Sequence, residues 1–170
     1  MPFTPMPLHL ETARLTLQPF TQADGAWWRQ LVVERNGQMP SADEAREVMG
    51  VQEDSAAKTG IALLTVRRRA EGDCIGYCGL IIGRSTIEEP EIAYELFRGA
   101  HGFGYATEAA TAIVEAAIAT GRRRLWSTVR AWNTPSFRVL EKLGFSRHHS
   151  TDDERGELVW LVRELTAPKP

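Results

Sequence analysis

The sequence predicts one α/β domain with a mixed, partly antiparallel central sheet flanked by helices. Three observations support this. Short segments that alternate apolar and polar residues interleave with segments of helical spacing, turn residues separate them throughout, and no internal repeat is present. The expected order is β-α-α-β-β-β-α-β-α-β-β. Residues 1–10 carry three prolines and are expected to be a loose lead-in, and residues 11–170 are expected to form the single domain.

Local signals place the first elements in order. Alternation of apolar and polar residues predicts an opening strand that stops near Pro19. Apolar residues at helical spacing predict a first helix over residues 24–34. Ser41 and Glu44 form a capping box, which predicts a second helix over residues 42–57. These two helices, joined by a turn-rich break, could form one wall of a cleft.

The later elements follow from the same signals. Asn133 and Pro135 are typical of the start of a helix, and Gly144 is typical of its end. The remaining segments are shorter and alternate in polarity, as strands do. The predicted strands cover residues 61–69, 73–82, 89–98, 125–131, 145–150 and 158–164.

One stretch, residues 89–120, organises the rest of the chain. A strand leads into a loop that contains Gly99, Gly102 and Gly104, and the loop opens directly into an alanine-rich helix that should stop at Gly121. Such a loop points several backbone N–H groups at one spot, with the positive end of the helix dipole behind them. We therefore expect an anion site here, and phosphate is the anion that fits it best.

The glycine spacing excludes two common phosphate motifs. A dinucleotide fingerprint that starts at Gly102 would need glycine at Thr107. A P-loop that starts at Gly99 would need lysine and then serine or threonine where Tyr105 and Ala106 stand. What remains is a Gly-x-Gly-x-Ala sequence over residues 102–106, at the mouth of a helix.

This loop resembles the pyrophosphate loop of the GNAT superfamily of N-acyltransferases, whose pattern is R/Q-x-x-G-x-G/A. Here Gly99 stands at the first position of the pattern, with Arg98 beside it. A second stretch, Asn133-x-x-Ser136 followed by EKLGF over residues 141–145, resembles the NxxSxxVLEKLGF signature of the same superfamily. The runs EIAY and GFGYATEA are similar to the branch of ribosomal-protein N-terminal (alanine/serine) acetyltransferases. The resemblance implies the GNAT fold from Glu11 onward.

The resemblance also implies a binding site for acetyl-CoA, which serves as acyl donor without a metal. The pantetheine arm would hydrogen-bond to the backbone near Leu96, and the pyrophosphate would contact the amides of residues 101–106. The expected donor-binding residues are Leu96, Phe97, His101, Gly102, Phe103, Gly104, Tyr105, Ala106, Thr107, Asn133, Ser136, Arg138 and Lys142.

Acyl transfer to an amine needs a neutral amine, an oxyanion stabiliser and a stabilised thiolate. The resemblance makes Glu91 the first candidate base, and Glu95, on the same strand face, the second. The oxyanion would be held by the backbone N–H of Leu96. Leu140 stands where many relatives have an acidic tyrosine, so Ser136 is the candidate that protonates or hydrogen-bonds the sulfur. The structural alternatives are solvent-facing strand positions for the glutamates and a simple helix start for the serine.

Composition excludes several classes of protein. A net charge of −2 argues against a general nucleic-acid binder, and no apolar run approaches the roughly 20 residues of a membrane span. The N-terminus lacks the features of a signal peptide, so a cytoplasmic location is expected.

Cys74 and Cys78 should lie roughly 13 Å apart on one strand, too far for a disulfide. His148 and His149 should alternate faces of a strand, so they form no metal pair alone.

The sequence thus supports two functions. The first is an acetyl-CoA-dependent N-acetyltransferase in which an amine, from a protein N-terminus or a small molecule, attacks the bound thioester directly. The second is a non-catalytic acyl-CoA-binding or sensing module, favoured by the missing tyrosine at Leu140. The expected partners are acetyl-CoA and an amine acceptor, with no nucleic acid or membrane, and the protein is expected to be a monomer or homodimer.

Overall fold

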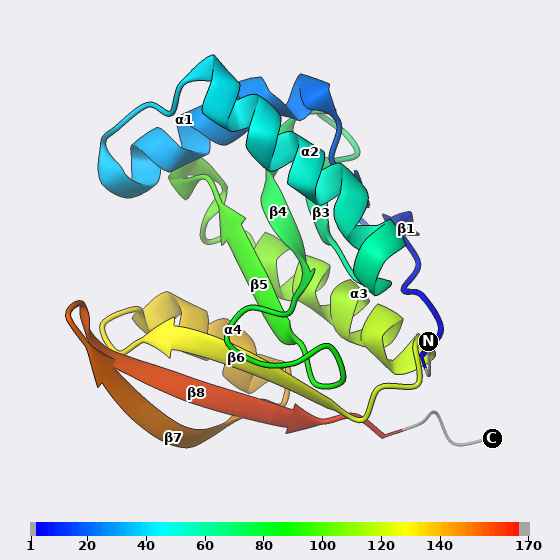
Figure 1. Cartoon of the computed structure of the whole chain (residues 1–170), viewed down its shortest axis with the longest axis vertical. Coiled ribbons are helices and arrows are strands. Elements are labelled where there is room, and N and C mark those ends of the chain that lie inside the picture. Colours follow the sequence, from blue (N-terminus) through cyan, green and yellow to red (C-terminus); the bar gives the residue numbers. More distant parts are fainter. Residues whose placement is uncertain (1–2, 167–170) are drawn as a thin grey trace.

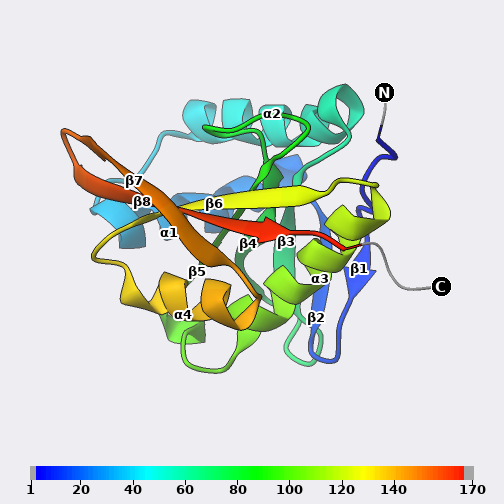
Figure 2. The same cartoon turned by 90° about the horizontal axis from the view of Figure 1, so that it is seen from below.

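A computed structural model of the protein describes residues 3–166. Its eight strands form one sheet in the order β1-β2-β3-β4-β5-β6-β8-β7. Neighbouring strands are antiparallel except β5 and β6, which run parallel. Helices α1 and α2 lie on one side of the sheet, and α3 and α4 lie on the other (Figures 1 and 2). The predicted mixed sheet with helices on its faces is therefore confirmed.

The predicted order of elements is also confirmed, with one short strand added at the N-terminus. The strands are β1 (Leu10–Glu11), β2 (Leu15–Pro19), β3 (Leu63–Arg68), β4 (Cys74–Ile81), β5 (Glu91–Leu96), β6 (Arg124–Arg130), β7 (Ser146–Asp153) and β8 (Gly156–Glu164). The helices are α1 (Gly25–Asn36), α2 (Ala42–Thr59), α3 (Tyr105–Ala119) and α4 (Thr134–Lys142). Two residues are too few to show an alternating pattern, which is why β1 has no signal in the sequence.

The segment before β2 packs against the domain along part of its length. Met6 is buried, and its backbone N–H donates to the carbonyl oxygen of Gly60 at 2.9 Å. Leu10 pairs with Leu17 of β2. The expected lead-in therefore contributes a side chain to the core and a strand to the edge of the sheet.

Helix α3 lies close to the sheet because its buried face is made mostly of alanine. Ala109, Ala110 and Ala117 are fully buried, together with Ile113. Small side chains at these positions let the helix backbone approach β2, β4 and β5, on which it packs. This packing fixes the direction in which the N-terminus of α3 points.

The parallel pair β5 and β6 creates the opening in which the site lies. The two strands pair at a single register point, Glu91 opposite Trp126. Beyond it, no ladder joins them within residues 3–166, and they diverge (Figure 1). Because the strands are parallel, the helices that follow them, α3 and α4, both begin at the diverging end.

Strand β4 can approach its neighbours closely only because it carries two glycines, Gly76 and Gly79. Gly79 shows the reason. A Cβ atom on Gly79 would lie 2.2 Å from the carbonyl oxygen of Ala62 and 2.6 Å from the Cα atom of Leu63. These contacts are with backbone atoms of the adjoining chain segment, which cannot move aside independently. Gly79 is therefore required by the close approach of the strands.

We predict that Gly79→Ala destabilises the protein by roughly 3 kcal/mol, because the added methyl group must displace backbone atoms. Chemical denaturation followed by tryptophan fluorescence measures the change. Gly50→Ala is the control: a Cβ atom there meets no atom within 4 Å, inside α2. It should stabilise the protein by about 0.5–1 kcal/mol, since alanine favours helix. Equal midpoints for the Gly79→Ala variant and the wild type would contradict the prediction.

Candidate active site

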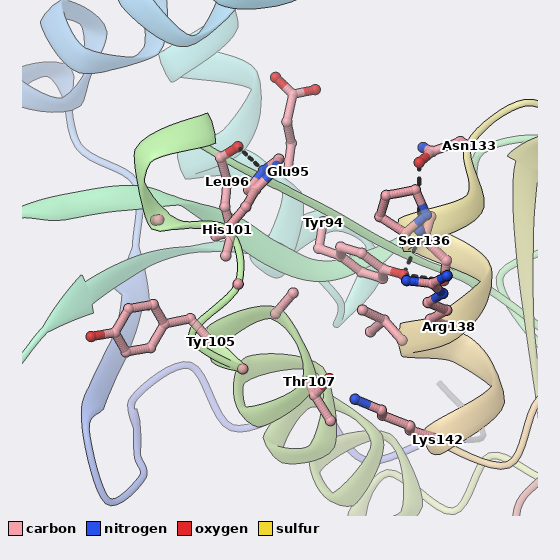
Figure 3. A pocket seen from close by; sticks show the side chains of 16 residues that line it. Tyr94, Glu95, Leu96, His101, Tyr105, Thr107, Asn133, Ser136, Arg138 and Lys142 are labelled. Carbon is pink, nitrogen blue, oxygen red and sulfur yellow. Dashed lines mark hydrogen bonds between the residues drawn. The ribbon is translucent and has the colours of Figure 1, made fainter.

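A cavity of about 550 Å³ opens where β5 and β6 diverge. Its walls come from the end of β5, the glycine loop, the first turn of α3 and one face of α4 (Figure 3). The lining residues are Tyr94, Glu95, Leu96, Ala100, His101, Gly102, Gly104, Tyr105, Ala106, Thr107, Asn133, Pro135, Ser136, Arg138, Val139 and Lys142.

The structure brings most of the predicted donor-binding residues together around this cavity. The exceptions are Phe97, whose amide pairs with the carbonyl oxygen of Ile75, and Phe103, whose ring is 59% exposed. Tyr94 and Val139 line the cavity without having been predicted. Each follows from periodicity: Tyr94 is two residues before Leu96 on one strand face, and Val139 is one helical turn after Ser136.

The glycine loop leaves a group of backbone amides unpaired. Gly102 and Gly104 have φ values of +85° and +80°, a left-handed conformation that favours glycine. Within the described residues, none of the amides of residues 102–107 donates to a protein acceptor, whereas the amide of His101 donates to the carbonyl oxygen of Arg98. The unpaired amides include those of the first turn of α3, where the helix dipole is positive.

An ion pair with the segment between β1 and β2 holds this loop in place. Arg14 donates to the carbonyl oxygen of Phe103 at 2.8 Å and to the carboxylate of Glu108 at 2.7 Å. The Thr12 hydroxyl donates to the same carboxylate at 2.6 Å. Partial burial opposes ionisation of Glu108, but the hydrogen bonds from Thr12 and Arg14 outweigh it and lower the pKa of Glu108. With the Phe103 carbonyl held by Arg14, the loop keeps its amides unpaired.

Helix α4 begins at the opposite wall of the cavity. Asn133 is its N-cap, and its side-chain oxygen accepts from the amide of Ser136 at 3.4 Å. The Ser136 hydroxyl lies 2.9 Å from the hydroxyl of Tyr94 on β5. Burial raises the pKa of Tyr94 to about 12. The confirmed start at Asn133 thus places two hydroxyl groups between β5 and α4.

Cationic groups face the unpaired amides across the cavity. Arg138 and Lys142 follow Ser136 along the cavity face of α4, and Lys142 extends toward Thr107 of α3 (Figure 3). His101 lies on the glycine-loop side of the cavity, where its Nε2 atom is 2.9 Å from the carbonyl oxygen of Leu96. Unpaired amides and basic side chains around one cavity suit a ligand that carries several negative charges.

Glu95 is the carboxylate that the structure places at this cavity. It lines the cavity and extends from β5 toward α1, where its carboxylate lies 3.0 Å from the guanidinium of Arg35 (Figure 3). Its side chain keeps 27% of its surface exposed. It can therefore meet a second ligand that arrives from the side of α1.

Glu91 does not reach the cavity. Its side chain is buried, and its carboxylate accepts from the amide of Arg84 at 2.5 Å and from the hydroxyl of Thr128 at 2.9 Å. A Cβ atom on Gly83 would lie 2.7 Å from the Glu91 carboxylate. Glu91 and Glu95 are four positions apart along β5, which places their Cα atoms about 13 Å from each other. In this arrangement, Glu91 holds the loop after β4 against β6.

A bulge in β7 changes the expected arrangement of two histidines. The pairing between β7 and β8 shifts between Arg147 and His149, so His148 is an extra residue in the strand. Both imidazoles consequently lie beside the Trp126 ring, with 2.8 Å between their Nδ1 atoms. The expectation that the two rings alternate faces is wrong, because strict alternation fails at a bulge.

No metal site or membrane span emerges from the part of the chain that the structure describes. Over residues 3–166, no three histidine, cysteine, aspartate or glutamate side chains are grouped as metal ligands. Both cysteines are free thiols, as expected. Among the helices of that range, none has the length and apolar character needed to cross a bilayer.

Comparisons with known proteins agree with this geometry. The sequence profile of the acetyltransferase (GNAT) domain matches residues 14–146. An acetyltransferase from Agrobacterium tumefaciens is 28% identical, with a TM-score of 0.77 over 91% of this chain and 93% of that one. RimL, a ribosomal L7/L12 α-N-protein acetyltransferase in complex with coenzyme A, is 14% identical, with a TM-score of 0.80 over 96% and 99%. The ribosomal-protein-S5-alanine acetyltransferase from Vibrio fischeri is 15% identical, with a TM-score of 0.78 over 96% and 100%. The profile match extends over most of the chain and includes both predicted motifs, so this protein belongs to the GNAT family of acetyltransferases.

Proposed function

We propose that this protein is an N-acetyltransferase that transfers the acetyl group of acetyl-CoA to an amine by direct attack in a ternary complex. The observation that carries the proposal is the set of unpaired amides over residues 102–107, which faces Arg138 and Lys142 across the cavity. Such a surface matches the pyrophosphate of coenzyme A, the ligand that the similar RimL structure contains.

The divergence of β5 and β6 supplies the place for the rest of the donor. A pantetheine arm that enters beside Leu96 can pair with strand backbone left without a partner on that side, since the ladder between β5 and β6 ends at Glu91. A backbone N–H of β5 near Leu96 would then hold the thioester oxygen as negative charge develops on it. Asn133 lies on the facing wall, within the cavity.

The acceptor amine has to lose a proton before it can attack. An aliphatic ammonium group has a pKa near ~10.4 and a peptide α-amine near ~7.7–8.0, so a base matters more for a lysine than for a protein N-terminus. Glu95 is the base that we favour, acting directly or through water, because it lines the cavity while the carboxylate of Glu91 is occupied. A protein N-terminus or a small amine fits this site.

A non-catalytic acyl-CoA-binding module is the second candidate. It is favoured by Leu140, which is fully buried at the position where the family resemblance implies a tyrosine acid. Catalysis does not depend on that acid, however. An alkyl thiol has a pKa near ~8.5, so its thiolate is a tolerable leaving group near neutral pH, and Ser136 can hydrogen-bond it.

An acceptor screen tests the proposal. With acetyl-CoA as donor, we expect release of free thiol with at least one member of a panel of lysine-type, small aliphatic and peptide α-amines. Coenzyme A should compete, whereas NAD and ATP should not, because the loop fits neither of their motifs. Tight binding of acetyl-CoA without turnover on any amine would favour the binding module instead.

We predict that Arg14→Ala weakens coenzyme A binding about tenfold, a change of about 1.4 kcal/mol, because the loop loses the cation that holds its Phe103 carbonyl. Isothermal titration calorimetry measures the affinity. Arg46→Ala is the control, since it removes the same charge from an exposed position on α2 that pairs with Asp43. An unchanged dissociation constant in Arg14→Ala would show that the loop holds its shape without the ion pair.

We also predict that Glu95→Gln lowers kcat/KM for an aliphatic amine at pH 7 by about 10²- to 10⁴-fold, the usual contribution of a general base. The loss should shrink as the pH approaches ~10.4, where the amine becomes neutral by itself.

Glu91→Gln is the comparison for this test. We expect it to lower stability by about 1–3 kcal/mol through its buried hydrogen bonds, and to leave the shape of the pH–rate profile unchanged. If Glu91→Gln and not Glu95→Gln shows the loss that high pH rescues, the base is Glu91.

A further inference from the structure

A tyrosine hydroxyl lies at the wall of the cavity without a role in the steps described above. Tyr94 points from β5 at the first turn of α4 (Figure 3). Its hydroxyl oxygen lies 2.9 Å from the Ser136 hydroxyl and 3.2 Å from the Ser136 carbonyl oxygen. Both side chains line the cavity, and each has a single hydroxyl hydrogen to donate.

We propose that Tyr94 is a positioning residue that directs the Ser136 hydroxyl at the sulfur of coenzyme A as the thiolate leaves. This inference rests on the proposed function, because it concerns the leaving group of that reaction. It assigns Tyr94 an action through Ser136 and not a contact of its own with the reacting atoms.

The geometry allows two arrangements of the two hydroxyl hydrogens. In the first, Tyr94 donates to the Ser136 carbonyl oxygen and Ser136 donates back to the Tyr94 oxygen. In the second, Tyr94 donates to the Ser136 hydroxyl oxygen, which leaves the serine hydrogen free for a third group. The exchange requires only rotation about two C–O bonds. A thiolate inside the cavity favours the second arrangement, because it accepts a charge-assisted hydrogen bond.

The acidities favour a hydrogen bond to the sulfur over transfer of the tyrosine proton to it. Burial raises the pKa of Tyr94 to about 12, whereas an alkyl thiol has a pKa near ~8.5. Moving the tyrosine proton to sulfur would therefore be uphill by more than three pKa units. In the chemical step, the C–N bond forms, the C–S bond breaks with its electron pair on sulfur, and the proton of the amine goes to the base. The thiolate is held as an anion and takes a proton from water later.

The position of Ser136 in α4 also favours a negatively charged sulfur next to its hydroxyl. Ser136 lies in the first turn of this nine-residue helix, whose N-terminus faces the cavity. The N-terminal end of a helix favours negative charge. Asn133 holds the Ser136 amide, which limits the movement of the serine. The tyrosine then sets the direction in which the serine hydroxyl points.

The pKa of the coenzyme A thiol, when bound to the protein, tests this role without an acceptor. We expect the wild type to lower it about one unit below the ordinary ~8.5, as measured by the ultraviolet absorbance of the thiolate during a pH titration. Tyr94→Phe and Ser136→Ala should each reduce the lowering, and Tyr94→Phe should add nothing in a Ser136→Ala background. The other titratable groups of the cavity, Glu95, His101, Tyr105, Arg138 and Lys142, are common to all variants.

Tyr77→Phe is the control. It removes the hydroxyl of another tyrosine that is half-buried in the sheet but does not line the cavity. The thiol pKa should stay at the wild-type value in this variant. A Tyr94→Phe protein with the wild-type thiol pKa would overturn the proposal. A loss of affinity for coenzyme A at a pH well below the thiol pKa, where the neutral thiol binds, would also overturn it, since that indicates a packing role.

Steady-state kinetics give a second readout. Tyr94→Phe should lower kcat about tenfold, equivalent to about 1.4 kcal/mol of transition-state stabilisation, with KM for acetyl-CoA within about twofold of the wild type. An unchanged kcat would contradict the proposal and leave the proposed function intact. A wild type that binds coenzyme A but acetylates no amine would instead contradict the proposed function, and the thiol titration would still decide the role of Tyr94.

Discussion

The constraint on which the rest of the site depends is the parallel pairing of β5 with β6 at one register point. Parallel strands direct the helices that follow them to the same end of the sheet. Because the pairing stops after Glu91, the strands separate at that end and leave a cavity between two helix N-termini. The unpaired amides lie at the N-terminus of α3, and the hydroxyl pair lies at that of α4. One break in a ladder thus leaves room for both the anion site and the thiolate site that we propose.

The shape of the anion site is maintained from a distant part of the chain. Thr12 and Arg14 lie in the segment between β1 and β2, yet they hold Glu108 of α3 and the backbone of the glycine loop. The guanidinium of Arg14 also lies 4.4 Å from the centre of the Tyr105 ring. A loop of left-handed glycines can adopt many other conformations. An ion pair that fixes one of its carbonyl groups reduces the number of these conformations. The segment between β1 and β2 thereby supports the loop that we propose binds the donor, without lining the cavity itself.

Charged and hydroxyl groups divide the cavity into functional regions. Arg138 and Lys142 face the amides and suit phosphate, while Tyr94 and Ser136 lie between β5 and α4. Glu95 extends toward α1, on the side from which an acceptor can approach. Direct transfer in a ternary complex needs the donor and the acceptor to meet from different sides, and this arrangement of groups allows it.

The sequence by itself determined the order of the elements, the glycine loop, the capping box at Ser41 and the N-cap at Asn133. These depend on residues that are near one another in the chain, and backbone chemistry acts at that range. Only the tertiary structure distinguishes the surroundings of Glu91 and Glu95, because both lie on one strand face and differ in what packs against them. It also decided the meeting of Tyr94 with Ser136, 42 residues apart, and the bulge at His148. Strand alternation tells which side chains share a face. It does not tell which side chains of another element they meet, and it does not predict a one-residue shift in register.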